Sequence, residues 1–236
     1  MNAEDRDIID RFRRSFFEAT FRSWVEDGSI EVGSRTFDEL LTDFRRLLQD
    51  FVNEPDFEET EFHPIFDHQE KLLERAVTET NEGDDLIGIM FYATWFEHFI
   101  NGILIRSLRR AGFAEDIYIP MIRTFNLQTK MASTWKLAGL PEVPAEMIRT
   151  LNLVTELRNG FVHYKWSALS PQAEEQQKTR LREATNQVAS LVSYFKAVED
   201  QFFWNGREAE LIEAFRADLL EAERENPPPY PAIVRS

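Results

Sequence analysis

Apolar residues return every three or four positions along almost the whole chain, which is the spacing that gives an α-helix one apolar face. The segment FDELLTDFRRLLQDF, residues 37–51, shows this most clearly, and a capping box formed by Thr36 and Glu39 marks its start. No stretch alternates apolar and polar residues as a half-buried β-strand does. Nine glycines and ten prolines are also few for a 236-residue chain built from hairpins. The sequence therefore predicts an all-α protein.

Breaks in the helical pattern predict how the chain is divided. An acidic stretch with two prolines covers residues 53–67, and the proline-rich run NPPPYPAIVRS ends the sequence. We expect an N-terminal helical extension over residues 1–65, a helical bundle over residues 66–205, and a C-terminal helix with a proline-rich tail over residues 206–236.

One segment, LIGIMFYATWFEHFINGILI at residues 86–105, is about long enough to span a bilayer. Glu97, His98 and Asn101 lie near its middle, where polar and ionisable groups are costly in lipid. We therefore expect the buried central helix of a soluble protein, with no membrane partner. The N-terminus is charged where a secretory signal is apolar, and the absence of cysteine fits a reducing compartment, so a cytoplasmic location is expected.

The net charge of −15 opposes binding to bulk nucleic acid, but the charge is unevenly distributed. Residues 37–97 carry 4 basic and 17 acidic groups, whereas residues 98–165 carry 9 basic and 5 acidic groups. The second block, with a net charge of +4, leaves room for an anionic ligand. Chance clustering of basic residues on solvated helix faces is the alternative.

A helix predicted from Ala145 to about Trp166 has two distinct faces. At 100° per residue, one apolar stripe would face the core, with Arg158 on its flank. The stripe comprises Leu151, Val154, Leu157, Phe161 and Tyr164. The opposite face comprises Asn152, Glu156, Asn159, His163 and Trp166. Asn159 and His163 are therefore neighbours on a face that the core does not need.

Two residues of this helix suit a surface that meets another molecule. Trp166, on the polar face, fits a partner, a dimer interface or a cleft wall better than open solvent. Gly160, inside the helix, costs about 1 kcal/mol relative to alanine, which favours a close approach at that point. Fraying of the helix near Gly160 is the alternative.

The run RNGFVH at residues 158–163 resembles the signature of the HEPN superfamily (higher eukaryotes and prokaryotes nucleotide-binding domains). In that signature four to six residues separate an arginine from a histidine, and a polar residue, often asparagine, follows the arginine. Arg158, Asn159 and His163 match it residue by residue, and the resemblance covers about residues 68–204.

This resemblance implies a compact helical bundle that dimerises, so that two motifs face each other in a shared cleft. Many HEPN proteins are metal-independent endoribonucleases of toxin–antitoxin and antiphage systems, and others are binding modules without catalysis. One subgroup has a tyrosine two positions after the histidine, which a partner nucleotidyltransferase modifies. Here that position holds Lys165, and Tyr164 stands one position earlier, so the chain departs from this subgroup.

Cleavage of RNA without a metal ion needs a base for the 2′-hydroxyl, an acid for the 5′-oxygen and a cation near the phosphorane. The histidine side chain in general titrates near neutral pH, so His163 suits the base or acid role, alone or as a pair in a dimer. Arg158 offers forked donors to phosphate oxygens, and Asn159 would hold the phosphate or orient the imidazole. The expected product is a 2′,3′-cyclic phosphate, and no cofactor is expected.

Further residues are expected to support this site. The candidates for binding the RNA backbone or stacking on a base are Lys130, Lys136, Lys165 and Trp166. Glu97 and Asn101 are candidates for positioning Arg158. Alternatively, Glu97, His98 and Asn101 satisfy one another or nearby backbone groups inside the bundle.

One segment has a pattern of metal ligands. HPIFDH, residues 63–68, would present His63, Asp67 and His68 to a divalent ion if it were helical. Pro64 and the acidic surroundings favour a solvated loop instead, so no metal site is expected.

Taken together, the residues and the resemblance favour a HEPN-type endoribonuclease that acts as a homodimer. Its substrate would be RNA, with tRNA as a candidate, and its role that of a toxin or an antiphage or stress effector under an antitoxin or other regulatory protein. The alternative is a catalytically inactive HEPN-like module that binds a protein partner or a nucleotide, and the net charge of −15 favours this alternative.

Overall fold

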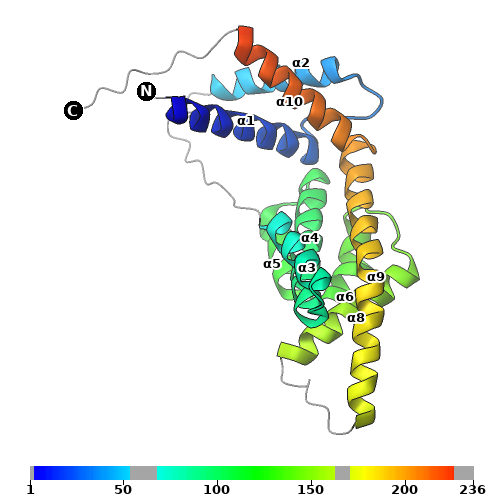
Figure 1. The fold of residues 1–236 in the computed structure, drawn as a ribbon. Helices are drawn as coiled ribbons and strands as arrows, with labels where there is room; N and C mark the ends of the chain where they lie inside the picture. Colours follow the sequence, from blue (N-terminus) through cyan, green and yellow to red (C-terminus); the bar gives the residue numbers. More distant parts are fainter. Residues whose placement is uncertain (1–2, 54–67, 163–170, 226–236) are drawn as a thin grey trace, which may run out of the picture. The chain divides into compact units, whose positions relative to one another are not determined.

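The computed structural model of the chain describes residues 3–53, 68–162 and 171–225 (Figure 1). Every regular element in these ranges is a helix and none is a strand, so the predicted all-α class is confirmed. No helix within them is both long and apolar enough to cross a membrane. The chain divides into two compact units: unit 1 comprises residues 1–61 and 200–236, and unit 2 comprises residues 62–199.

Unit 1 joins helices from both ends of the sequence. It contains α1 (Ala3–Glu26), α2 (Phe37–Val52), α10 (Glu208–Glu225) and the last turn of α9 (Pro171–Trp204). Ion pairs fix α1 and α10 side by side in antiparallel order, joining Arg14 to Glu223, Glu18 to Arg216, and Arg22 to Glu208. Helical periodicity alone does not show which helices pair. The sequence therefore predicted an N-terminal extension and a C-terminal helix as separate segments.

Local signals and aromatic packing account for the order within unit 1. α2 begins at the predicted capping box, where the Thr36 N–H donates to Glu39 Oε2 at 2.7 Å and the Glu39 N–H donates to Thr36 Oγ1 at 3.4 Å. In the core, Phe21 stacks on Phe215 with ring centroids 4.5 Å apart, and Phe44 meets Phe21 edge-on at 5.6 Å. These ring contacts join α1, α2 and α10 in one aromatic core.

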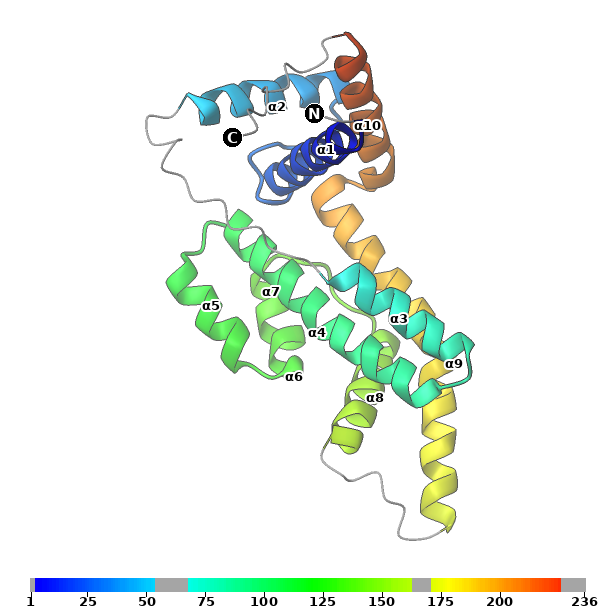
Figure 2. The same cartoon turned by 60° about the vertical axis from the view of Figure 1, so that its left-hand side comes forward.

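Unit 2 carries Arg158 and Asn159 of the run RNGFVH. Its elements are α3 (Gln69–Asn81), α4 (Asp85–Arg110), α5 (Glu115–Thr124), α6 (Leu127–Thr129), the π-helical turn η2 (Lys130–Thr134), α7 (Trp135–Leu137), α8 (Ala145–Val162) and most of α9. Helices α3 and α4 lie side by side in Figures 1 and 2. Their approach is close, because a Cβ on Gly88 of α4 would lie 2.3 Å from Thr80 Oγ1 of α3.

The predicted central helix is α4. It begins at Asp84, whose carboxylate accepts a hydrogen bond from the Ile87 N–H at 3.2 Å. Its apolar side chains are buried among the neighbouring helices of unit 2; Trp95, Phe96 and Phe99 lie in one aromatic cluster with Phe195 of α9 and Trp135 of α7. Glu97 and His98 are exposed on the same helix, which explains how an otherwise apolar segment carries ionisable groups.

The segment from Leu127 to Leu137 is helical throughout, and its middle is a π-helix. The π turn contains an extra residue, which shifts the side chains that follow it around the helix axis, and such turns are frequent at functional sites. Lys130 is its first residue, and the Lys130 side chain is buried.

Candidate functional site

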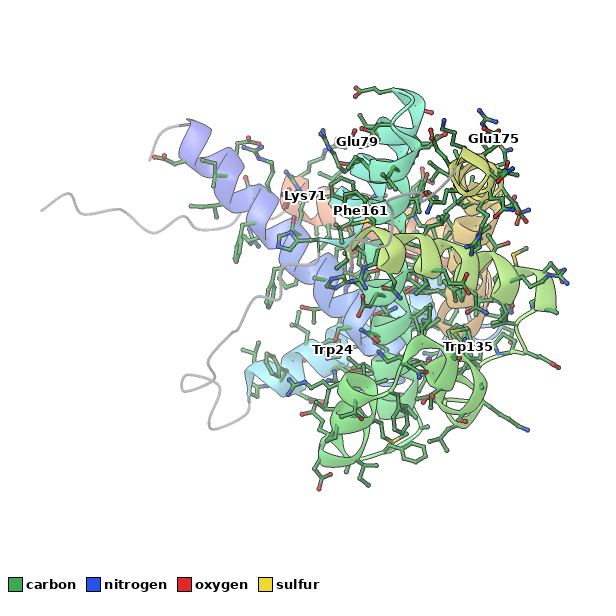
Figure 3. All side chains as sticks on the ribbon, turned by 90° about the horizontal axis from the view of Figure 1, so that it is seen from below. Trp24, Lys71, Glu79, Trp135, Phe161 and Glu175 are labelled. Carbon is green, nitrogen blue, oxygen red and sulfur yellow. The ribbon has the colours of Figure 1, made fainter. Side chains whose placement is uncertain are left out.

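Helix α8 brings the motif residues to α4 through its apolar stripe. Leu151, Val154 and Leu157 are buried, as the helical wheel predicts. Phe161, labelled in Figure 3, is 38% exposed, so its predicted place in the core is wrong. The apolar face of α8 loses its cover from the rest of the described chain in the last turn, which leaves Phe161 and Val162 at the surface.

Five of the predicted site residues line one pocket of about 180 Å³ in unit 2. They come from three elements: Glu97 and Asn101 from α4, Lys130 from the π turn, and Arg158 and Asn159 from α8. These residues are up to 62 positions apart in sequence, from 97 to 159. We call this pocket the arginine pocket.

Arg158 is held in the arginine pocket by weak contacts. Its Nη2 lies 3.4 Å from Glu97 Oε2, and its Nη1 donates to Asn159 Oδ1 at 3.1 Å. The side chains of Arg158 and Glu97 are 35% and 55% exposed, so water screens their attraction and the pair contributes less than about 1 kcal/mol. A phosphate group would therefore have little to displace.

Lys130 is the buried cation of the arginine pocket. The residue is 7% exposed, and its Nζ donates to Asn101 Oδ1 at 2.7 Å. Burial lowers the pKa of Lys130 because it removes water from the ammonium, and the negative charge of Glu97 opposes this effect in part. Asn101 thus positions Lys130, in place of the predicted contact with Arg158.

The charges that line the pocket are unbalanced. Arg158 and Lys130 are basic, and Glu97 is the one acidic residue among the lining residues. Because Glu97 is solvated and Lys130 is not, an anion entering the pocket meets a cation that little water screens. The arrangement suits a phosphate group, which accepts hydrogen bonds from guanidinium, ammonium and amide donors.

The remaining predicted residues are not part of this pocket as described. Lys136 is exposed and lines a second pocket beside Trp135. His163, Lys165 and Trp166 lie outside the described residues. The same holds for His63 and Asp67 of the metal-like segment, and His68 precedes the first residue of α3. The described part of the chain contains no group of three residues able to hold a metal ion.

Sequence reasoning missed two polar residues in the arginine pocket. Thr155 stands one helical turn before Arg158 and Asn159, and its hydroxyl donates to the Leu151 carbonyl at 2.8 Å. Asn126 precedes α6, where its side chain accepts from the Thr129 N–H at 2.9 Å. The three- and four-residue spacing would have indicated Thr155, and the capping pattern would have indicated where α6 begins, though not that Asn126 lines the arginine pocket.

Comparison with known protein families, curated proteins and solved structures finds no match to this chain.

Proposed function

We propose that this chain is a HEPN-type endoribonuclease that cleaves RNA without a metal ion, at a site shared by two copies of the chain. One observation carries the proposal: Arg158 and Asn159, which match the HEPN motif, line the same small pocket as the buried Lys130. The pocket has an excess of basic residues and a size suited to a phosphate group.

In the proposed reaction, the 2′-oxygen of RNA attacks the neighbouring phosphorus. A base removes the 2′-proton, the bond from phosphorus to the 5′-oxygen breaks, and an acid protonates that oxygen, which leaves a 2′,3′-cyclic phosphate. His163, from one copy or from both, supplies the base and the acid. Arg158 and Lys130 stabilise the negative charge that builds on the phosphorane, and Asn159 fixes the orientation of Arg158 through its 3.1 Å hydrogen bond.

Glu97 supports the alternative function, which is binding without catalysis. Its carboxylate lies 3.4 Å from Arg158 and competes with any phosphate for the guanidinium, and residues 37–97 are strongly acidic. A catalytically inactive HEPN-like module that binds a protein partner or a nucleotide is therefore the second candidate. In a nuclease, the phosphate of the RNA would have to displace this weak pair to reach the Arg158 guanidinium.

The biological role that fits this activity is that of a toxin or of an antiphage or stress effector in the cytoplasm. RNA, including tRNA, would be its substrate, and an antitoxin or another regulatory protein would control it. These assignments rest on the resemblance to HEPN proteins.

The test is incubation of the purified chain with total tRNA and a generic single-stranded RNA in EDTA, with the product ends mapped. Arg158→Ala and His163→Ala should each abolish the cleavage that the wild type shows. Arg149→Ala, an exposed arginine on the same helix but outside the arginine pocket, and His98→Ala, an exposed histidine on α4, are the matched controls and should retain it. Cleavage that persists in Arg158→Ala and His163→Ala would refute the proposal, and no cleavage by the folded wild-type dimer would favour the binding module.

Mixing the two inactive variants tests whether the site is shared. If Arg158 and His163 act from different copies, a heterodimer of Arg158→Ala and His163→Ala contains one wild-type pair and regains activity. If both residues act from the same copy, every pair in that heterodimer lacks one residue, and the mixture stays inactive.

A further inference from the structure

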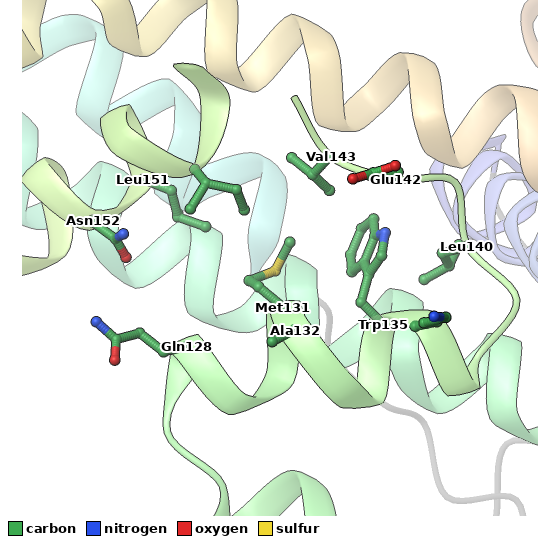
Figure 4. A pocket seen from close by; sticks show the side chains of 11 residues that line it. Gln128, Met131, Ala132, Trp135, Leu140, Glu142, Val143, Leu151 and Asn152 are labelled. Atoms are coloured by element: carbon green, nitrogen blue, oxygen red, sulfur yellow. The ribbon is translucent and has the colours of Figure 1, made fainter. Parts of the chain in front are cut away.

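A second pocket, of about 610 Å³ (Figure 4), is lined in part by the same elements as the arginine pocket. Helix α8 and the segment from Leu127 to Trp135 contribute to both. On α8, Leu151 and Asn152 line the second pocket, whereas Arg158 and Asn159 line the arginine pocket. We call this second pocket the amide pocket, after the side-chain amides of Gln128 and Asn152 at one of its ends.

The spacing of the two pockets follows from helix geometry. Asn152 and Asn159 are seven residues apart, which is about 10.5 Å along a helix that rises 1.5 Å per residue. In a stacked strand successive nucleotides are about 3.4 Å apart along the axis, so this distance corresponds to about three nucleotides, or fewer in an extended strand. The distance along α8 between these two asparagines is therefore within the span of a short RNA strand.

The lining of the amide pocket combines apolar walls with polar side chains at both ends. Met131, Val143 and Ile148 are partly exposed walls, and Trp135 is buried beneath them, with its indole N–H donating to the Pro141 carbonyl at 2.7 Å. Figure 4 shows Gln128 and Asn152 together at one end and Leu140 and Glu142 at the other. The volume falls within the range of about 300–1,000 Å³ that is usual for small-molecule sites.

The two amides of this pocket are available to a ligand. The side-chain amides of Gln128 and Asn152 hydrogen-bond no other residue within the described ranges. A primary amide presents a donor and an acceptor side by side, which pairs with the edge of a nucleobase, while the faces of the base need apolar contact.

We infer that the amide pocket binds a base of the RNA substrate, one to three nucleotides from the phosphate held by Arg158 and Lys130. This inference rests on the proposed function and extends it, because it assigns the pocket that distinguishes one RNA base from another. The apolar walls hold the faces of the base, and Gln128 and Asn152 read its edge. The arginine pocket favours a nucleic acid as the ligand over an apolar side chain of a protein. An RNA strand whose phosphate lies in the arginine pocket would place its neighbouring bases along α8.

The binding test uses an RNA analogue that cannot be cleaved. The chain has five methionines, of which Met131 lines the amide pocket and Met147 lines a separate pocket between α8 and α9. With methyl-labelled methionine, NMR is recorded while 2′-O-methyl trinucleotides of A, C, G or U are added, because a blocked 2′-oxygen cannot attack phosphorus. At least one trinucleotide should shift the Met131 methyl signal and leave that of Met147 in place.

Matched variants locate the effect. Ile148→Trp fills the amide pocket and should abolish the Met131 shift, whereas Leu153→Trp, on the same helix but in the α8–α9 pocket, should preserve it. Asn152→Leu should reduce the preference among the four trinucleotides by about tenfold, which is the discrimination that one paired amide supplies. Asn186→Leu, also in the α8–α9 pocket, should not change the preference.

Each outcome decides the inference separately from the proposed function. A Met131 signal that no trinucleotide shifts, that still shifts in Ile148→Trp, or whose response to the four bases does not change in Asn152→Leu overturns the base site, even if Arg158-dependent cleavage is observed. A Met131 signal that moves on dilution of the protein instead would assign the pocket to a side chain of a second copy, and would also overturn it. A selective Met131 shift in a chain that cleaves no RNA would support the base site while the proposed nuclease fails.

Discussion

Gly160 tests both the packing of α8 and the proposed site, because it stands between Arg158 and His163 in the motif. A Cβ added at Gly160 would meet no heavy atom of the described residues within 4 Å, apart from its own helix backbone and chain neighbours. Gly160→Ala therefore keeps all described contacts and gains helix propensity. We expect the free energy of unfolding of unit 2 to rise by about 1 kcal/mol, which is about a fivefold change in the folding equilibrium.

Gly88→Ala is the matched control, since Gly88 is also a helical glycine of unit 2. Its added Cβ would lie 2.3 Å from Thr80 Oγ1 and 3.2 Å from two backbone atoms of α3, the Ala76 carbonyl oxygen and the Thr80 nitrogen. Overpacking of this kind costs about 1–3 kcal/mol, which exceeds or cancels the gain of about 1 kcal/mol in propensity. The double variant Gly88→Ala with Thr80→Ala should recover part of the loss, because it removes the nearest atom.

Hydrogen exchange in increasing urea, read by mass spectrometry on peptides from α4 and α8, reports unit 2 separately from unit 1. Gly160→Ala should protect α8, whereas Gly88→Ala should leave the protection of α4 unchanged or lower it. A change of the same sign and size in both variants would refute the packing argument. If RNA or a second chain approaches the backbone at Gly160, Gly160→Ala will also lower cleavage while it raises stability, and unchanged cleavage would refute that role.

Three further predictions concern charge and the core. The pKa of Glu18 is lowered, because hydrogen bonds and charges from Arg216 and Arg22 outweigh the opposing effect of burial. Unit 1 should therefore lose stability as the pH falls below about 4.5 through the folded pKa of Glu18, and Glu18→Gln should weaken this dependence in thermal melts at pH 7 and pH 3.5. The pKa of Lys130 is also lowered, so the unfolded chain holds a proton that the folded chain releases, and the free energy of unfolding of unit 2 should rise with pH up to the ordinary lysine value of 10.5. Lys130→Met should remove that rise, as measured by urea unfolding at pH 8 and pH 10. Phe215→Ala should destabilise unit 1 by about 3–5 kcal/mol, because Phe215 is fully buried, whereas Phe12→Ala, at a residue 71% exposed, should change the stability by less than about 0.5 kcal/mol in the same urea assay.

Each of these predictions has a clear contrary result. If the acid dependence is unchanged in Glu18→Gln, the ion pairs of Glu18 do not give this carboxyl a different pKa in the folded and the unfolded chain. A stability of unit 2 that falls between pH 8 and pH 10 would show that the ammonium of Lys130 is better stabilised in the fold than in water. Equal losses in Phe215→Ala and Phe12→Ala would contradict the placement of the aromatic core of unit 1.

The helices themselves could be predicted from local features. The three- to four-residue apolar spacing, the Thr36–Glu39 capping box and the acidic start of α4 act within a few residues of each other, so the sequence alone reports them. The wheel of α8 correctly predicted that Leu151, Val154 and Leu157 are buried. It was wrong for Phe161, since a wheel gives the direction of a side chain but not the point along the helix where neighbouring helices stop covering it.

The sequence by itself determined the all-α class and the placement of the motif residues Arg158 and Asn159 on one helix. Both follow from interactions within one or two helical turns. Only the tertiary structure decided which distant residues share the arginine pocket. Glu97 and Asn101 reach it because α8 packs against α4, and Lys130 enters it from the π turn, where burial changes its pKa. Such contacts depend on which helices pair and at what register, and that choice belongs to the packing of the whole unit and to no single segment.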